Sequence, residues 1–269
     1  MYFVLKVQTN RPFRMTRIFF YQLLIILIFA SIDVSAQSSI QIFPVKTDNL
    51  NLFDKVRNRS VPIALYLPIT DRKIRKQKLV IFSHGYGENK GGDYLVYSYL
   101  TENLASLGYF VVSIQHELPT DSLLAMTEPY YITRKSNWER GVRNIHFVLN
   151  EMKRLNPDLD YEHLSLIGHS NGGDMTALFA TKYPDLADKI ITLDNRRMAL
   201  PKSRHPRIYS IRSSDLPADD GVLPTSSEAE KYRIKIVKLA NTKHTEMDND
   251  ANAEQRKEIN SYLENFISN

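Results

Sequence analysis

Short uninterrupted apolar runs alternate along this chain with longer segments whose apolar residues follow helical spacing. The short runs are bounded by polar turns, glycine or proline and predict buried strands. They cover residues 61–67, 79–83, 109–114, 163–167, 189–193, 207–211 and 233–239. Apolar residues three or four positions apart predict helices over residues 94–107, 137–155, 171–183 and 253–267. This alternation predicts an α/β fold, a mostly parallel, doubly wound sheet flanked by helices on both faces.

One long segment, residues 115–136, shows no clear period and contains two prolines. We expect a loop there, with one short helix at most. Ligands of doubly wound sheets bind outside the carboxyl ends of the strands, so we expect this loop to be the main cover over the site. No internal repeat or linker divides the chain further, which predicts a single domain over residues 37–269.

The N-terminus has the composition of a secretory leader. A basic region (Arg11, Arg14 and Arg17) precedes an apolar run over residues 18–30, and small residues lead up to Ala36. We therefore predict a signal peptide over residues 1–36, cleaved near Ala36, and an exported protein, periplasmic or secreted. The apolar run is shorter than the about 20 residues of a membrane span, and an uncleaved membrane anchor is the alternative. Met15 is an alternative start, because the leader is complete from there.

Charge and cysteine content exclude several kinds of function. The whole chain carries a net charge of +5, but the leader holds four basic residues and one acid, which leaves 31 basic and 29 acidic residues in the mature part. So balanced a protein gives no electrostatic reason to bind nucleic acid. The chain has no cysteine, which excludes disulfides, a thiol nucleophile and an iron–sulfur site.

The chemistry is carried by Gly168-His169-Ser170-Asn171-Gly172, which matches the pattern G-x-S-x-G. It lies directly after a predicted strand and directly before a predicted helix, which is the context that the motif requires. Such a turn is sharp and strained, and side chains two positions before or after the serine would clash. The sequence therefore predicts Ser170 as a nucleophile, with the helix N-terminus favouring negative charge beside it. An ordinary glycine-rich turn with a surface serine is the alternative.

A second motif, Ser83-His84-Gly85-Tyr86-Gly87, follows the strand over residues 79–83. With this His-Gly pair the chain resembles the α/β-hydrolase family of serine esterases and lipases. The resemblance covers the chain from about residue 63 to the C-terminus. It implies that backbone N–H groups of Tyr86, or of Gly85, and of Asn171 form an oxyanion hole. It also implies that His84 is a structural histidine that holds this loop.

The resemblance implies a chain order of serine, then acid, then histidine. A serine hydroxyl needs a base to take its proton, and that base needs a carboxylate on its other nitrogen. His205 and His244 are the histidines after Ser170, and His244 follows the last strand, where the family places its base.

The acid is less sharply indicated. Asp215 follows the penultimate strand and is the first choice. Asp194, at the end of the preceding strand, is the alternative location in this fold. Asp219 and Asp220 lie in the same loop as Asp215 and compete with it.

The resemblance has one departure. About a dozen residues separate the strands over 189–193 and 207–211, which leaves no room for a large cap domain. Arg196 and Arg197 follow Asp194 at the ligand-facing end of the sheet, and Arg197 is a candidate for binding a substrate carboxylate, a solvated pair being the alternative. His116 and Glu117 end another strand at the same edge, where we expect a structural role.

These observations predict an exported serine hydrolase, a carboxylesterase that works through a Ser-His-Asp triad and an acyl-enzyme. The expected substrate is a small-molecule ester, and no metal or cofactor is expected. The segment 248–252 resembles the start of a calcium loop but lacks the later Gly and Glu of that motif. A peptidase or amidase on the same triad, and a catalytically silent binding protein of this fold, are the alternatives.

Overall fold

The computed structural model describes residues 1–5 and 41–269. The chain divides into two units, Met1–Ile40 and Gln41–Asn269, and the second is compact. Most of the predicted leader and its cleavage site lie outside the described residues, so the leader stays a prediction. No helix in the described ranges is long and apolar enough to cross a membrane.

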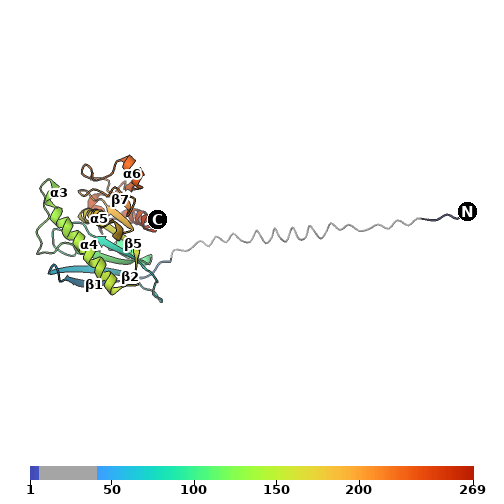
Figure 1. Ribbon diagram of the computed structural model, residues 1–269, viewed down its shortest axis with the longest axis horizontal. Helices are drawn as coiled ribbons and strands as arrows, with labels where there is room; N and C mark the ends of the chain where they lie inside the picture. The colour runs from blue at the N-terminus through green and yellow to red at the C-terminus, as the bar shows by residue number, and fades with distance from the viewer. Residues whose placement is uncertain (6–40) are drawn as a thin grey trace. The chain divides into compact units, whose positions relative to one another are not determined.

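An eight-stranded sheet runs through residues 41–269 in the order β1-β2-β4-β3-β5-β6-β7-β8. The strands are β1 (Val45–Asp54), β2 (Arg59–Pro68), β3 (Lys78–Ser83), β4 (Phe110–Ile114), β5 (Asp160–His169), β6 (Lys189–Leu193), β7 (Arg207–Arg212) and β8 (Lys235–Lys238). β1 pairs with β2, and β2 with β4, in antiparallel fashion, and all other pairs are parallel (Figure 1). The predicted α/β class and mostly parallel sheet are confirmed.

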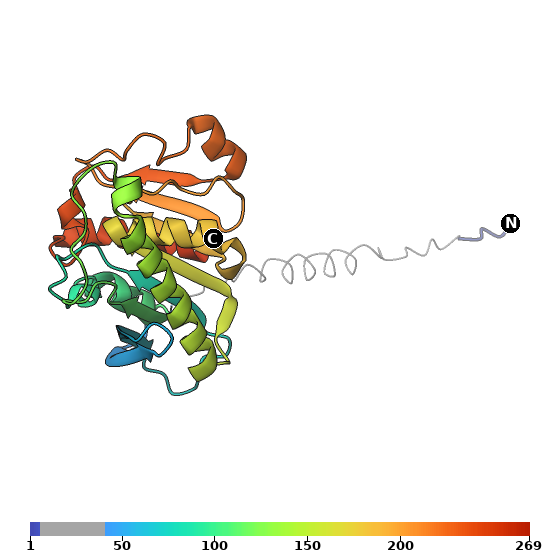
Figure 2. The same cartoon turned by 60° about the vertical axis from the view of Figure 1, so that its left-hand side comes forward.

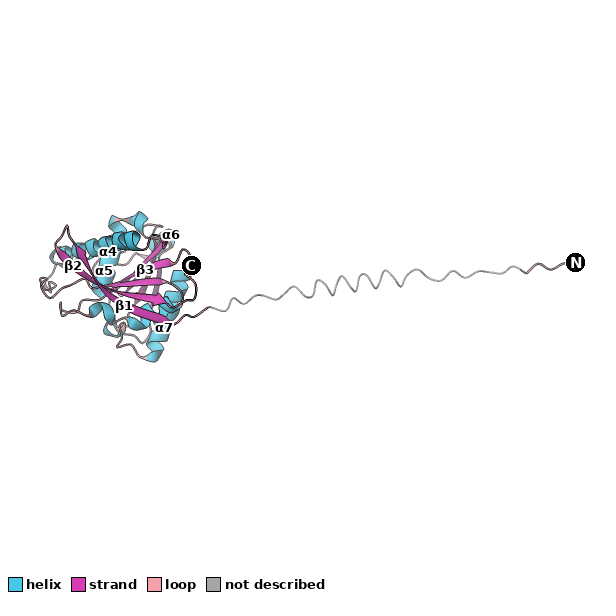
Figure 3. Cartoon of the chain, turned by 90° about the horizontal axis from the view of Figure 1, so that it is seen from below, coloured by secondary structure: helices cyan, strands magenta, loops and turns pink. Residues whose placement is uncertain are grey.

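Helices cover both faces of the sheet. The helices are α2 (Ser98–Ser106), α3 (Tyr130–Thr133), α4 (Lys135–Leu155), α5 (Ser170–Lys182), α6 (Ser226–Tyr232) and α7 (Ala253–Ser268), with short 3-10 turns at Asp93–Leu95, Pro184–Leu186 and His244–Glu246. One buried cluster joins α4 and α5 to the sheet, and a second joins α2 and α7 to its other face. Figure 3 shows α4 and α7 on opposite sides of the strands.

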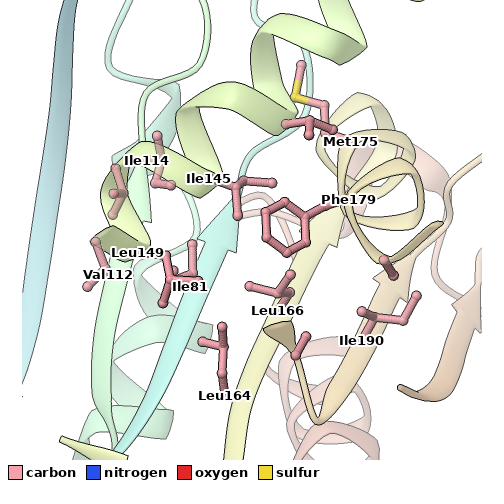
Figure 4. Packing of buried hydrophobic residues seen from close by; sticks show 14 of the residues in the cluster. Ile81, Val112, Ile114, Ile145, Leu149, Leu164, Leu166, Met175, Phe179 and Ile190 are labelled. Carbon is pink, nitrogen blue, oxygen red and sulfur yellow. The ribbon is translucent and has the colours of Figure 1, made fainter. Parts of the chain in front are cut away.

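The packing of α4 and α5 fixes the strand that leads into the site. Ile145 and Leu149 of α4 and Phe179 of α5 point onto Leu166 of β5 and its neighbours (Figure 4). All four side chains are at most 1% exposed. A fully buried side chain of this kind contributes about 1.5–3 kcal/mol relative to an exposed one. The strand β5 is therefore covered by α4 and α5 on one face, and α5 is fixed against the sheet.

Three elements differ from the sequence-based expectation. The strand β1 was not predicted, and neither was α6. The single helix expected over residues 94–107 is a 3-10 turn at Asp93–Leu95 followed by α2. The expected short helix in the segment 115–136 is α3, which leads directly into α4 (Figure 2). Between β6 and β7, residues 194–206 contain no helix and no cap domain.

Parallel strands bring their carboxyl ends to one edge of the sheet, and the chemistry-bearing residues follow these ends. His84 comes after β3, Glu117 after β4, Ser170 after β5 and Asp194 after β6. His244 follows β8 by a short loop. One edge of the sheet therefore collects the candidate site, as ligand binding in this class of fold requires.

Candidate active site

Ser170 occupies the turn between β5 and α5, with a left-handed backbone φ of 51°. This conformation is costly for a residue with a side chain, so the surroundings must hold it. Gly172 lies so close to the Ser83 and His84 carbonyl oxygens that a Cβ there would collide with them. A Cβ on Gly168 would collide with Gly172 in turn. The two glycines of the motif thus allow β5, α5 and β3 to approach closely around the serine.

The serine begins a continuous chain of three hydrogen-bonded side chains. Ser170 Oγ lies 2.9 Å from His244 Nε2, and His244 Nδ1 lies 2.5 Å from Asp194 Oδ2. The His244 side chain is 14% exposed and that of Asp194 is fully buried. An imidazole held in this way has one nitrogen free to accept the serine proton.

Asp194 is surrounded by donors. Ser213 donates to it from both its backbone N–H, at 3.0 Å, and its hydroxyl, at 2.9 Å. Arg212 Nη2 lies 2.8 Å from Asp194 Oδ1. Burial alone would raise the pKa of the Asp194 carboxyl, but the bond from His244, the Arg212 charge and the Ser213 N–H hold that pKa below its ordinary value. The carboxylate is therefore ionised where it faces the imidazole.

The first choice of acid, Asp215, does not contact the imidazole ring. Asp215 is exposed, and its carboxylate accepts the backbone N–H of His244 at 2.9 Å. Asp219 pairs with Arg197 instead, and Asp220 lines a surface cavity. The structure thus places the alternative acid, Asp194 at the end of β6, on the imidazole ring, and the first choice, Asp215 after β7, on the backbone of the same histidine.

In the loop after β3, the N–H groups of Gly85 and Tyr86 differ in their hydrogen-bond partners. The Gly85 N–H donates to the Tyr97 hydroxyl at 3.0 Å, while the Tyr86 N–H has no acceptor within the described residues. Asn171 lies in the first turn of α5, where helix geometry leaves N–H groups without an acceptor. Of the two N–H groups predicted for this loop, that of Tyr86 is the one available to an oxyanion.

Two histidines support this arrangement. His84 Nδ1 lies 2.6 Å from the Gly85 carbonyl, and its Nε2 accepts the His116 N–H at 2.9 Å. The His169 ring lies against the His244 ring in a tilted arrangement, with centroids 4.8 Å apart, and its Nδ1 lies 2.7 Å from the Tyr97 hydroxyl. Burial and the neighbouring His244 lower the pKa of His169 to about 3, so His169 is neutral and does not add a charge beside the candidate base.

Arg197 lies in the segment between β6 and β7, three residues after Asp194. Its backbone N–H donates to Asp174 of α5 at 3.0 Å, and its guanidinium lies over the Tyr130 ring, 4.3 Å from the centroid. It also pairs with Asp219. Arg197 lines a cavity of about 580 Å³ between α3 and residues 218–222. The Arg197 guanidinium is thus already paired with Asp219 and Tyr130. The predicted binding of a substrate carboxylate by Arg197 stays a prediction.

Several residues of the site carried no assignment from sequence. Arg212 and Ser213 bind Asp194, and the Tyr97 hydroxyl joins Gly85, in the loop after β3, to His169. A position directly after a strand was the available signal for Arg212 and Ser213, whereas Tyr97 had none, because it reads as helix packing. No group of three or more metal-binding side chains occurs among residues 1–5 and 41–269.

The sequence matches no family model and no curated protein, whereas the fold has many counterparts. A lidless α/β serine hydrolase from Xanthomonas campestris is 16% identical, covers 84% of this chain and 96% of its own, and gives a TM-score of 0.54. A hyperthermophilic esterase from the archaeon Pyrobaculum calidifontis is 14% identical, with 84% and 87% covered and a TM-score of 0.59. A thermostable carboxylesterase cloned from a metagenomic library is 14% identical, with 84% and 90% covered and a TM-score of 0.59. This chain therefore has the α/β-hydrolase fold, without a large cap.

Proposed function

We propose that this protein is a serine hydrolase that cleaves carboxylic esters, with Ser170 as nucleophile, His244 as base and Asp194 as the acid. The observation that carries the proposal is the hydrogen-bonded chain from Ser170 Oγ through His244 to Asp194, with the serine in a strained turn. The esterase neighbours support hydrolase chemistry on this fold. Their low identity leaves the activity itself to be tested.

In the first half-reaction, Ser170 Oγ bonds to the ester carbonyl carbon while His244 Nε2 takes the hydroxyl proton. The N–H groups of Tyr86 and Asn171 stabilise the negative charge on the carbonyl oxygen. When the tetrahedral intermediate collapses, its bond to the alcohol oxygen breaks, and His244 returns the proton to that oxygen. The products are a free alcohol and an acyl group on Ser170.

In the second half-reaction, His244 takes a proton from water as the water oxygen bonds to the acyl carbon. The bond to Ser170 Oγ then breaks and the serine regains its proton, which releases a carboxylic acid. Asp194 keeps the imidazole oriented and stabilises its charged form in both halves. The three side chains thus return to their starting state.

The short connection between β6 and β7 supports small or medium acyl groups, because no cap encloses a long chain. The predicted leader supports a protein that acts outside the cytoplasm, and export is part of the proposal. Mass spectrometry of the N-terminus of the exported protein tests it: we expect a chain that begins at Gln37. An exported protein that still carries residues 1–36 would contradict cleavage and favour a membrane anchor.

Fluorophosphonate labelling of the purified mature protein tests the activity. We expect the label on Ser170 in peptide mass spectra, with labelling and ester turnover lost in Ser170→Ala and His244→Ala. Ser122→Ala, which alters an exposed serine of the segment 115–136, is the matched control and should keep both. A folded wild type without labelling or turnover would overturn the enzyme assignment and favour a ligand-binding protein of the same fold. Aminoacyl amides cleaved as fast as esters would favour the peptidase.

A further inference from the structure

A group of buried polar side chains surrounds Asn171, the residue after the proposed nucleophile. Glu117 comes from the segment after β4, and Asn137 and Trp138 come from the first turn of α4. Glu117 is 1% exposed, Asn137 6%, Trp138 0% and Asn171 itself 3%. The proposed mechanism uses the backbone of Asn171 but none of these side chains.

All four side chains are joined by hydrogen bonds. Trp138 Nε1 donates to Asn171 Oδ1 at 2.8 Å. Asn171 Nδ2 donates to Asn137 Oδ1 at 2.9 Å and to Glu117 Oε1 at 3.1 Å. Asn137 Nδ2 also donates to Glu117 Oε1, at 3.1 Å. Because an indole N–H only donates and a carboxylate only accepts, these partners determine which way the Asn171 amide faces.

Burying the Glu117 carboxylate at this position is energetically unfavourable. Glu117 has no lysine or arginine within ion-pairing distance among the described residues, and its Oε2 has no hydrogen-bond partner there. A buried acid without a paired cation costs folding free energy. Its one bonded oxygen, Oε1, serves Asn171 and Asn137, and Asn137 is itself bonded to Asn171. The contacts of Glu117 therefore converge on the residue whose N–H faces the developing oxyanion.

Glu117 also lies next to the other half of the proposed oxyanion hole. Its Oε2 is 3.7 Å from His84 Nε2, and His84 Nδ1 holds the Gly85 carbonyl directly before Tyr86. The buried Glu117 carboxylate thus lies between the Asn171 side chain and His84, which contacts the loop that holds Tyr86.

We infer that Glu117 is a positioning residue that acts through the Asn171 side chain to hold the Asn171 N–H in line with the oxyanion, an inference that rests on the proposed esterase function. An oxyanion donor is effective only when it lies about 2.7–3.1 Å from the oxygen that becomes charged. A side chain fixed by three partners prevents the first turn of α5 from shifting by the tenths of an ångström that would weaken this bond. The effect is on the transition state, so it should appear in kcat rather than in KM.

Steady-state ester hydrolysis, normalised to active sites by fluorophosphonate titration, tests the inference. We expect Glu117→Ala to lower kcat about 10- to 100-fold with KM within about threefold, because losing a whole oxyanion donor costs about 10²–10³. Glu117→Gln keeps an oxygen acceptor and should stay within about threefold of wild type. Asp160→Ala, which removes a mostly buried carboxylate at the amino end of β5, is the matched control and should leave kcat unchanged.

Asn171→Ala keeps the backbone N–H but removes the side chain through which Glu117 acts. We expect it to lower kcat as much as Glu117→Ala does, and the double variant to be no slower than either single one, since the two residues act as one unit. If Glu117→Ala does not fold, Asn171→Ala and Asn137→Ala carry the same test by their kcat against KM.

The possible outcomes separate the positioning role of Glu117 from a general packing role and from failure of the proposed function. An active wild type with unchanged kcat in Glu117→Ala or Asn171→Ala overturns the positioning role alone. Additive losses in the double variant, or losses that appear in KM, overturn it as well and indicate a general packing role. A wild type without labelling or turnover overturns the proposed function and this role together.

Discussion

At the scale of single residues, two acids contact different parts of His244. Asp194 is fully buried and contacts the imidazole, whereas Asp215 is exposed and contacts only the backbone N–H of the same residue. Arg212 and Ser213 keep Asp194 ionised and oriented. A carboxylate on the ring nitrogen sets the tautomer and stabilises the imidazolium, while one on the backbone only helps to place the loop.

We therefore expect Asp194→Asn to lower kcat for ester hydrolysis by about 10⁴-fold, because the wrong tautomer then faces the serine. Asp215→Asn should lower it by less than about tenfold, since an amide oxygen can still accept the His244 N–H. Steady-state kinetics on the two folded variants provide the measurement. The reverse order of losses would return the catalytic role to Asp215.

At the scale of elements, the site depends on how closely α5 approaches β3. Gly172 lies against the carbonyl groups at the end of β3, and Ser170, with its positive φ, lies between β5 and α5, which pack together with α4 in one buried cluster. The segment 115–136 is tied to the same edge, since the Leu124 N–H donates to the Tyr86 hydroxyl at 3.0 Å. A shift of α5 would therefore move Ser170 and the Asn171 N–H together.

Gly172→Ala tests this close approach. The added Cβ would collide with backbone atoms of Ser83 and His84, which cannot move aside without breaking β3 pairing. We expect a loss of stability of about 1–3 kcal/mol and at least a tenfold loss of turnover in the protein that remains folded. Thermal unfolding and active-site titration measure the two effects. A variant with wild-type stability would show that α5 is free to move away from β3.

At the scale of the whole molecule, the link between β6 and β7 is held by a buried charge instead of a crossover helix. Asp174 Oδ1 of α5 accepts the N–H groups of Arg196, Arg197 and Met198 at 2.9–3.1 Å. Burial raises the pKa of Asp174 to about 6, although these three bonds oppose the shift. The folded protein therefore binds a proton at Asp174 more tightly than the unfolded chain does.

This pKa predicts how stability changes with pH. Between about pH 4 and pH 6 the native state holds the Asp174 proton and the unfolded state does not, so this group's contribution falls as pH rises. Asp174→Asn keeps an oxygen for the three N–H groups without the titration. We expect its unfolding free energy relative to wild type to grow from pH 4 to pH 7.5, by about 1–3 kcal/mol at 1.36 kcal/mol per pKa unit. Denaturant unfolding at several pH values measures the difference, and a difference that shrinks with rising pH would mean that the three bonds keep Asp174 ionised.

The sequence by itself determined the features that depend on local pattern. Buried strands and amphipathic helices leave short periods in the chain, so the α/β class, the parallel sheet and the order of most elements could be predicted. The motif around Ser170 could be placed in its turn for the same reason, because G-x-S-x-G between a strand and a helix is a local signal. The strand β1 was missed because it is an edge strand, and most of its residues are exposed and polar.

The tertiary structure decided everything that depends on which strand lies beside which. Asp194 and Asp215 both follow strands and look alike in sequence, and only the folded arrangement puts the first on the His244 ring and the second on the His244 backbone. The Tyr97 hydroxyl accepts the N–H of Gly85, which is 12 positions away in the sequence. The Glu117 carboxylate accepts the side-chain N–H of Asn171, which is 54 positions away. Contacts between residues so far apart in sequence leave no periodic trace, since each partner reads as an ordinary residue of its own element. The fold class and the turn around Ser170 could thus be predicted from local pattern. The contacts of His244 with Asp194 and of Asn171 with Glu117 depend on the tertiary structure.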